Sequence, residues 1–225
     1  MNLDNYDTTS LKIRICMTGS SGSGKSSIAC RYESNKFDEK ITQTIGLDFL
    51  TYFYRNNKLS EDIKIEIWDT AGQERYRSII KSYYHRADVL FIIFDVNNEY
   101  FLQEVINWHN EILENATSCN HVYIVGNKID KLNENEKEEK INFIKNTLEE
   151  LQYVRPIYFI SAKTNENMDK LLDDVITKLY HVKKEEQKKK NNLSTKNNTI
   201  NLINYNDNMN SSVNNNKNNN YCCNY

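Results

Sequence analysis

The feature that most constrains this chain is the segment GSSGSGKS at residues 19–26. An apolar run at residues 11–18 precedes it and predicts a β-strand, and the segment that begins at Ser27 can start a helix. Glycines at this spacing allow positive φ angles, so several backbone N–H groups can point at a phosphate, and the positive end of the helix adds to that field. The spacing is that of a phosphate-binding loop. It predicts that Lys25 reaches the β- and γ-phosphates of a nucleotide and that the Ser26 hydroxyl binds Mg²⁺.

Net charge excludes some classes of function. The chain has 225 residues and a formal net charge of −2, which argues against nucleic-acid binding through bulk charge. The charge is unevenly divided, because residues 183–225 hold seven Lys against three acidic side chains. A basic tail on a mildly acidic body is typical of contact with a membrane or another anionic partner.

Strand and helix patterns alternate through residue 182, and this alternation predicts an α/β fold with a largely parallel sheet. We expect the second and third strands to form an antiparallel hairpin, because only a short polar turn joins them. Apolar residues at helical spacing should form core. The expected strands are residues 11–18, 47–56, 62–68, 89–96, 121–126 and 156–160, and the helical stripes are residues 102–113, 141–151 and 168–179.

This pattern divides the chain into three parts. Residues 1–10 form an N-terminal extension, and residues 11–182 form one globular domain. Residues 183–225 form a Lys- and Asn-rich tail. We expect this tail to be disordered, because it cannot bury enough apolar surface to offset the entropy of the chain.

A second group of candidate residues lies in the segment DTAGQE at residues 69–74. Asp69 ends an apolar strand, where its carboxylate can hold a magnesium-bound water near the phosphate loop. Gly72 lets its backbone N–H approach the γ-phosphate, because no side chain stands in the way. Gln73 can orient an attacking water, since its amide both donates and accepts hydrogen bonds. Alone, Asp69 could be a helix cap and Gln73 a surface residue, but their combination with the phosphate loop favours a nucleotide site.

Two further motifs predict a guanine base: NKID at residues 127–130 and SAK at residues 161–163. Both follow strands, at the edge where open α/β sheets bind ligands. The Asp130 carboxylate matches the ring N–H and exocyclic amine of guanine, whereas adenine lacks this donor pair. Lys128 can lay its stem over the base, and the Ala162 N–H can donate to guanine O6. An N-K-x-D pattern alone is weak, because Asn and Asp are common in turns, but together with the phosphate loop it disfavours an ATPase or kinase.

Over about residues 11–182 these motifs resemble the Ras superfamily of small GTPases, and within it the Rab branch. The Rab-like segments are IGLDF at residues 45–49, IWDTAGQERYRSI at residues 67–79 and the tyrosine pair at residues 83–84. The resemblance implies a three-layer P-loop GTPase fold. Such a fold has a six-stranded, mostly parallel sheet with one antiparallel edge strand, flanked by five helices.

The resemblance also implies roles for individual residues. Ser26 and Thr44 are expected to bind Mg²⁺ directly and Asp69 through water, and Gln73 is the expected catalytic residue. The segments around Thr44 and Gln73 would be the two nucleotide switches. The expected effector and switch residues are Ile45, Gly46, Asp48, Phe49, Trp68, Arg75 and Tyr76. The expected nucleotide-binding residues are Ser21, Gly22, Ser23, Gly24, Lys25, Ser26, Ser27, Thr44, Gly72, Asn127, Lys128, Asp130, Ser161, Ala162 and Lys163.

As a Rab-like GTPase, the chain is expected to bind GTP or GDP as a monomer, to hydrolyse GTP slowly and to regulate vesicle traffic. Its expected partners are an exchange factor, a GTPase-activating protein, a GDP-dissociation inhibitor, a prenylation escort and Rab-type effectors. Arg86, Phe159, Ile160 and a longer turn at residues 54–60 depart from the family pattern and bear on effector identity. Two alternatives are a nucleotide-gated effector-binding module with negligible hydrolysis and another branch of the superfamily.

Cys222 and Cys223, near the C-terminus, resemble the doubly geranylgeranylated end of Rab proteins. Two lipid chains give stable anchoring, and the lysines within residues 183–190 could assist at an anionic leaflet. We therefore expect a cytoplasmic protein that binds reversibly to the cytosolic face of an intracellular membrane, such as the Golgi, an endosome or a vesicle. The alternatives are a pair of exposed free thiols, and a lysine run that is only the solvated end of the last helix.

Overall fold

A computed structural model describes residues 11–39, 44, 46–57, 59, 61–70, 77–116, 121–150 and 156–189, with the backbone alone over residues 77–80. The chain divides into two units, Met1–Leu179 and Tyr180–Tyr225, and each is described by itself. Several predicted features lie outside the described residues: the extension 1–10, the chain from residue 190 onward with Cys222 and Cys223, and Ile45, Gly72, Gln73, Arg75 and Tyr76.

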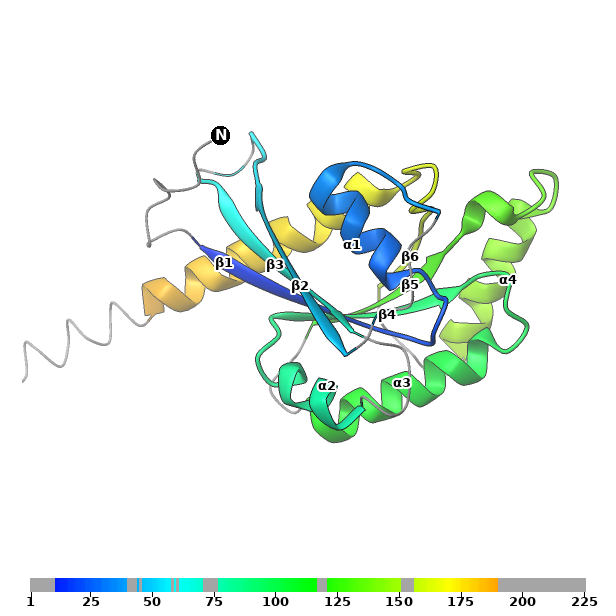
Figure 1. The fold of residues 1–225 in the computed structure, drawn as a ribbon, viewed down its shortest axis with the longest axis horizontal. Helices are drawn as coiled ribbons and strands as arrows, with labels where there is room; N and C mark the ends of the chain where they lie inside the picture. The colour runs from blue at the N-terminus through cyan, green and yellow to red at the C-terminus, as the bar shows by residue number, and fades with distance from the viewer. Residues whose placement is uncertain are drawn as a thin grey trace, which may run out of the picture. The chain divides into compact units, whose positions relative to one another are not determined.

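Strands and helices alternate along the first unit (Figure 1). The elements in chain order are β1 (Lys12–Thr18), α1 (Lys25–Ser34), β2 (Leu47–Tyr54), β3 (Ile63–Thr70), α2 (Arg77–Tyr84), β4 (Val89–Asp95), α3 (Phe101–Asn115), β5 (Val122–Asn127), the short 3₁₀ helix η3 (Ile129–Lys131), α4 (Lys137–Glu150) and β6 (Ile157–Phe159). A last helix over residues 168–189 begins in this unit. Together with α1 to α4 it makes five α-helices in the described part of the chain, as predicted.

The six strands form one sheet in the order β2-β3-β1-β4-β5-β6. β2 pairs antiparallel with β3 and occupies an edge, whereas all other neighbouring strands are parallel. The predicted mixed sheet with one antiparallel edge strand is therefore confirmed. β1 lies between β3 and β4, so the connections on its two sides run in opposite directions, and the phosphate loop follows β1 at this switch point, where such sheets bind ligands.

Helices cover both faces of the sheet, with α1 on one side and α2 and α3 on the other (Figure 1). β1 shows why both faces need cover, because Ile13, Ile15, Cys16 and Met17 are all buried. Cys16 belongs to the core beneath α2, α3 and α4. Parallel strands that are buried on both faces are expected to be continuously apolar, as β4 is from Val89 to Phe94. Among the described helices, none has the length and apolar composition needed to cross a bilayer.

Two predicted strand ends differ from the structure near the site. Asp69 was expected to end its strand or follow it, but β3 continues to Thr70 because its ladder with β2 extends to the pair of Leu47 with Thr70. Asn127 was expected after a strand, but it is the last residue of β5, paired with Asp95 of β4. The other strands match within one or two residues at each end, which is the usual uncertainty of such boundaries.

The last helix corrects the predicted start of the tail. We predicted a disordered tail from residue 183, but residues 183–189 are helical. Lysine and glutamate are good helix formers, and Lys184 Nζ lies 5.6 Å from the centre of the Tyr180 ring one turn earlier. Residues 183–189 thus belong to the end of the last helix, whereas a role of their lysines at a membrane stays a prediction.

Candidate functional site

The loop between β1 and α1 has the tight backbone that its glycine spacing predicts. Gly19 has a φ of 143°, and a Cβ there would lie 2.0 Å from the Ile93 carbonyl oxygen. Gly24 has a φ of 97°, and a Cβ there would lie 2.3 Å from Asn127 Nδ2. Space and backbone angle thus both exclude a side chain at these positions. The loop packs so closely on β4 and on the end of β5 that the phosphate and base motifs become neighbours.

Lys25 begins α1 and is only 5% exposed. Its Nζ donates to the carbonyl oxygens of Gly19 at 2.8 Å and Ser20 at 3.0 Å. Burial lowers the pKa of Lys25 to about 8, and the carboxylates of Asp69 and Glu104 oppose this shift. A buried ammonium held by neutral carbonyls at a helix N-terminus is well suited to a phosphate, because an anion there would replace the lost solvation.

Oxygen atoms from three segments converge beside Lys25. Ser26 Oγ lies 2.6 Å from Thr44 Oγ1, and Thr44 Oγ1 donates to Asp69 Oδ2 at 3.2 Å. Asp69 is 3% exposed, and its other oxygen, Oδ1, has no hydrogen-bond partner among the described residues. Burial raises the pKa of Asp69, whereas the Ser26 hydrogen bond and the Lys25 charge oppose this shift.

This oxygen cluster fits the predicted magnesium ion. Mg²⁺ prefers oxygen ligands and is usually held by one or two protein groups together with phosphates. Two hydroxyls and a buried carboxylate with an unpaired oxygen supply such donors. Within the described stretches, no group of three or more His, Cys, Asp and Glu side chains is arranged to hold a metal.

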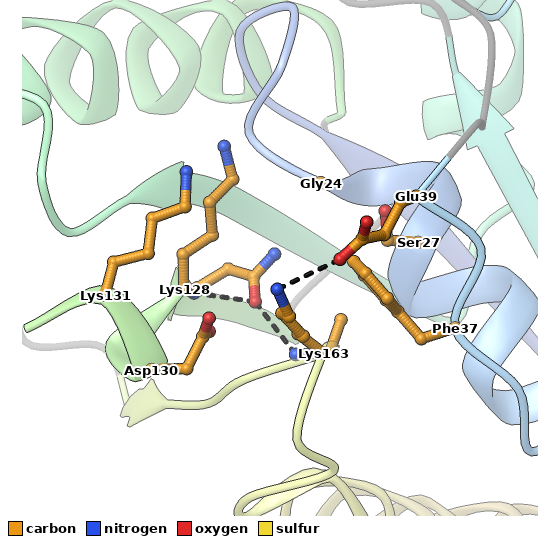
Figure 2. A pocket seen from close by; sticks show the side chains of 10 residues that line it. Gly24, Ser27, Phe37, Glu39, Lys128, Asp130, Lys131 and Lys163 are labelled. Atoms are coloured by element: carbon orange, nitrogen blue, oxygen red, sulfur yellow. Dashed lines mark hydrogen bonds and ion pairs between the residues drawn. The ribbon is translucent and has the colours of Figure 1, made fainter.

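A cavity of about 320 Å³ opens between the start of α1, the end of β5 and the loop after β6 (Figure 2). Seven predicted nucleotide-binding residues line it, which are Gly24, Ser27, Asn127, Lys128, Asp130, Ala162 and Lys163. The structure therefore brings together three motifs that lie more than thirty residues apart in the chain. We refer to this cavity as the purine pocket.

Asn127 ties the walls of the purine pocket together, and it is 1% exposed. Its Nδ2 donates to the Ser23 carbonyl at 3.0 Å, within the phosphate loop. Its Oδ1 accepts the backbone N–H groups of Lys128 at 2.8 Å and Ala162 at 3.2 Å. In this structure the Ala162 N–H, which we predicted would donate to a base, thus donates to Asn127. Asn127 holds the phosphate loop and the SAK loop at a fixed separation.

Lys128 has a φ of 68°, which is uncommon for a residue with a side chain and often marks a functional site. Its Nζ donates to the Gly22 carbonyl at 2.6 Å and to Asp95 Oδ2 at 2.8 Å. Desolvation raises the pKa of Asp95, but hydrogen bonds from Lys128 and Asn97 outweigh it and hold that pKa below its ordinary value. The stem of Lys128 is therefore fixed at both ends along one wall of the pocket.

Sequence reasoning missed two side chains that close the purine pocket. Phe37 and Glu39 follow α1 and line the cavity. Figure 2 shows both on the side opposite Asp130, where Lys163 Nζ meets Glu39 Oε1 at 3.0 Å. Asp130 Oδ1 accepts the Ser161 hydroxyl at 2.6 Å, which fixes its carboxyl group at the pocket wall. No motif spacing marked Phe37 or Glu39, and their only signal was their position shortly after the phosphate-loop helix.

A second group of predicted residues meets at the β2–β3 edge of the sheet. The rings of Phe49, Trp68 and Tyr83 form a mutual cluster with centroid distances of 6.1, 5.6 and 5.2 Å. Phe49 is 54% exposed, whereas Trp68 is buried. Asp48 is exposed at the start of β2, and Gly46 precedes it with a φ of 82°. Tyr83 is not among the predicted site residues, although it belongs to the Rab-like tyrosine pair at residues 83–84.

The strand order, with the nucleotide motifs gathered at the switch point of the sheet, is that of P-loop GTPases. The family model of the Ras family matches residues 14–181, which is most of the chain. This match agrees with the range of the resemblance found from the motifs.

Individual relatives narrow the family further. The GTP-binding protein YPT52 of Saccharomyces cerevisiae is 35% identical over 206 residues, covering 81% of this chain and 88% of the relative. The human Ras-related proteins Rab-30 and Rab-15 are each 33% identical, over 181 and 155 residues. They cover 80% and 69% of this chain, and 84% and 70% of their own lengths. The chain therefore belongs to the Rab family of small GTPases, and it is a GTP hydrolase.

Proposed function

We propose that this Rab-family GTPase is a membrane-anchored switch in vesicle traffic, which cycles between GTP- and GDP-bound states and hydrolyses GTP slowly. The observation that carries the proposal is the contact between Thr44 and the oxygen atoms of Ser26 and Asp69. Thr44 lies in the segment before β2, whereas Ser26 belongs to the phosphate loop and its helix. A segment whose position depends on contacts at the phosphates can report which nucleotide is bound.

The nucleotide is held by residues of both motif groups. Lys25 and the backbone N–H groups of residues 21–27 bind the phosphates. Asp130 reads the donor edge of guanine, while Lys128 and the SAK loop at residues 161–163 flank the base. Because the wrong base would leave a carboxylate without its donors, this arrangement favours guanine over adenine.

Ser26, Thr44 and Asp69 would hold Mg²⁺, with Ser26 and Thr44 as direct ligands and Asp69 acting through water. When bound, the ion supplies positive charge that offsets the negative charge that develops on the phosphates. The hydroxyl oxygens of Ser26 and Thr44 lie 2.6 Å apart, and buried Asp69 supplies negative charge beside them.

Hydrolysis is assigned to Gln73, which lies outside the described residues. Its amide would orient the attacking water, and the Gly72 N–H would contact the γ-phosphate. Intrinsic turnover in such enzymes is on the order of 10⁻⁴ s⁻¹, and an arginine supplied by an activating protein adds roughly 10³–10⁵-fold. Loss of the γ-phosphate would release Thr44 and Gly72, and with them both switches.

The substitution Gln73→Leu tests this assignment, because leucine cannot hydrogen-bond the water. We expect at least about a tenfold slower single-turnover hydrolysis of GTP with unchanged GTP binding, since a positioned catalytic group contributes about 10²–10⁴-fold. The matched control is Gln103→Leu, at an exposed position of α3. Equal hydrolysis rates for Gln73→Leu and the parent protein would refute the assignment.

The membrane and effector roles use two other parts of the chain. Phe49, Trp68 and Tyr83 offer a partly exposed aromatic surface next to the Thr44 segment, which suits an effector that reads the GTP state. Geranylgeranyl groups on Cys222 and Cys223 would anchor the protein to the cytosolic face of an intracellular membrane. Mass spectrometry of the C-terminal peptide from the native host should show two lipid chains, and an unmodified peptide would remove the anchoring proposal.

A further inference from the structure

Arg31, in the last turn of α1, makes hydrogen bonds to three backbone carbonyls. Its Nε donates to the Ala162 oxygen at 2.9 Å, and its Nη2 donates to the Lys163 oxygen at 2.7 Å. Its Nη1 donates to the Asn35 oxygen at 2.9 Å. Nothing in the sequence motifs marks Arg31, and it does not line the purine pocket itself. Its guanidinium group instead bonds to two residues that do line the pocket.

Two of the three carbonyls belong to residues that line the purine pocket, and the third, that of Asn35, lies two residues before Phe37 on the opposite side. Ala162 and Lys163 form the loop after β6, whereas Asn35 starts the segment that leads to Phe37 and Glu39. One planar guanidinium group therefore fixes the separation of the two walls. A planar fork of donors suits this task, because it sets direction as well as distance.

The Ala162 residue is held on both of its backbone polar groups. Its N–H donates to Asn127 Oδ1 at 3.2 Å, and its carbonyl accepts from Arg31. The loop is thus anchored to the end of β5 on one side and to the phosphate-loop helix on the other. A base that enters the pocket meets a loop whose position is already set, so little ordering cost remains at binding.

We propose that Arg31 is a positioning residue for guanine recognition: it holds the SAK loop against the Phe37 segment and so slows the release of GDP. This inference rests on the proposed role of the purine pocket. A simpler role for Arg31 is as a cation at the C-terminal end of α1, where positive charge is favourable. The two roles lead to different expectations. A charge at the helix end does not need the planar, forked shape of a guanidinium group, and it does not affect the preference of the pocket for one base over another.

The test measures the release of a fluorescent GDP analogue from Arg31→Gln after addition of excess unlabelled GDP. We expect release to be about tenfold faster than in the parent, which corresponds to about 1.4 kcal/mol. The factor should be the same with Mg²⁺ present and with Mg²⁺ chelated, because the change is at the base. We also expect the preference for GDP over inosine diphosphate, which lacks only the exocyclic amine, to fall about threefold or more, because Ser161 of the same loop holds the Asp130 carboxylate that would contact this amine.

Two further variants separate the clamp from the helix-end charge and from damage to the fold. Arg31→Lys keeps the charge but cannot bridge three carbonyls, so its release rate should stay close to that of Arg31→Gln. Arg55→Gln is the matched control, since Arg55 pairs with Asp62 in the exposed β2–β3 turn. Circular dichroism of the GDP-loaded proteins reports folding, and Arg31→Lys provides the measurement if Arg31→Gln does not fold.

Three outcomes would overturn the inference. Release from Arg31→Gln could equal that of the parent, Arg31→Lys could restore the parental rate, or GDP and inosine diphosphate could be released faster by equal factors. The last two would assign Arg31 to the helix end or to general stability. A parent protein that fails to retain GDP would overturn the proposed function as well, so the two failures are distinguishable.

Discussion

At the purine end of the pocket, the side chains of Asn127, Lys128 and Asp130 are bonded to other protein groups. At the phosphate end, two buried polar atoms have no such partner among the described residues. Asn127 bonds to three backbone groups, and Lys128 bonds to Gly22 and Asp95. In contrast, Asp69 Oδ1 and Ser23 Oγ are buried without a hydrogen-bond partner among the described residues.

This difference indicates how each end contributes to binding. The purine end is shaped before a ligand arrives, so it selects a base with little rearrangement. The phosphate end leaves a carboxylate oxygen and a hydroxyl without a partner among the described residues, and its ammonium is held only by neutral carbonyls, so this end gains most when phosphates and a metal ion fill it. Substitutions at the purine end should therefore act equally with and without Mg²⁺, whereas those at the phosphate end should act through the metal ion.

The largest effect is expected at the purine end, for Asp130→Ala. Two hydrogen bonds to a charged group would be lost, at about 1.5–3 kcal/mol each, so GDP affinity should fall roughly a thousandfold. Titration with fluorescent GDP, with and without a chelator, measures the loss and its independence from Mg²⁺. Asp62→Ala, in the exposed β2–β3 turn, is the control. A loss below about tenfold would contradict the proposed contact of Asp130 with the base.

The second prediction concerns the phosphate end, where Ser26→Asn removes a proposed magnesium ligand. The bulkier amide cannot take the place of the hydroxyl that lies 2.6 Å from Thr44 Oγ1. We expect Mg²⁺ affinity to fall about 10- to 100-fold, as for one lost bond to a charged group. In the parent, chelation should accelerate GDP release, and the variant should have lost most of that response. Ser34→Asn, at the exposed end of α1, is the control, and an unchanged response to chelation in Ser26→Asn would contradict the metal assignment.

Asp95→Asn tests the purine end indirectly. The substitution removes the negative charge that holds Lys128, and Asp95 is not itself a proposed contact of the ligand. The ion pair is partly buried, so GDP release should accelerate about three- to tenfold, with the same factor in chelator. The depressed pKa of Asp95 gives the sign of the pH dependence. The pair is complete at neutral pH and is lost only as the pH falls below the ordinary aspartate value of about 4. Release rates at pH 7 and pH 5.5 should therefore keep the same ratio of variant to parent, and a ratio that approaches one at pH 5.5 would contradict this.

The smallest effect is expected for Glu39→Gln. Its ion pair with Lys163 is exposed, with side-chain exposures of 72% and 54%. Such pairs contribute about 0.2–1 kcal/mol and are screened by salt. GDP release should therefore accelerate less than about fivefold at low salt, and the difference should vanish at high salt. A larger effect that persists in salt would show that Glu39 has a role beyond the ion pair.

Local spacing was sufficient to predict the parts of the site that lie within one motif. The glycine spacing of residues 19–26, the NKID segment and the SAK segment each place their side chains next to one strand end. The mixed sheet and the five helices could also be predicted, from the alternation of strand and helix patterns along the chain and from the resemblance to small GTPases. Asp69 and Asn127 were misplaced by one or two positions, because the end of a strand depends on pairing with its neighbours.

The sequence by itself determined which ligand class this protein binds, because phosphate and guanine recognition depend on groups set by short, local spacing. Only the tertiary structure decided which residues support those groups. Arg31 meets Ala162 across 131 positions of the chain, and Lys163 meets Glu39 beside Phe37. Such contacts follow from the order of strands in the sheet, which brings distant loops to one edge, and no local pattern encodes that order.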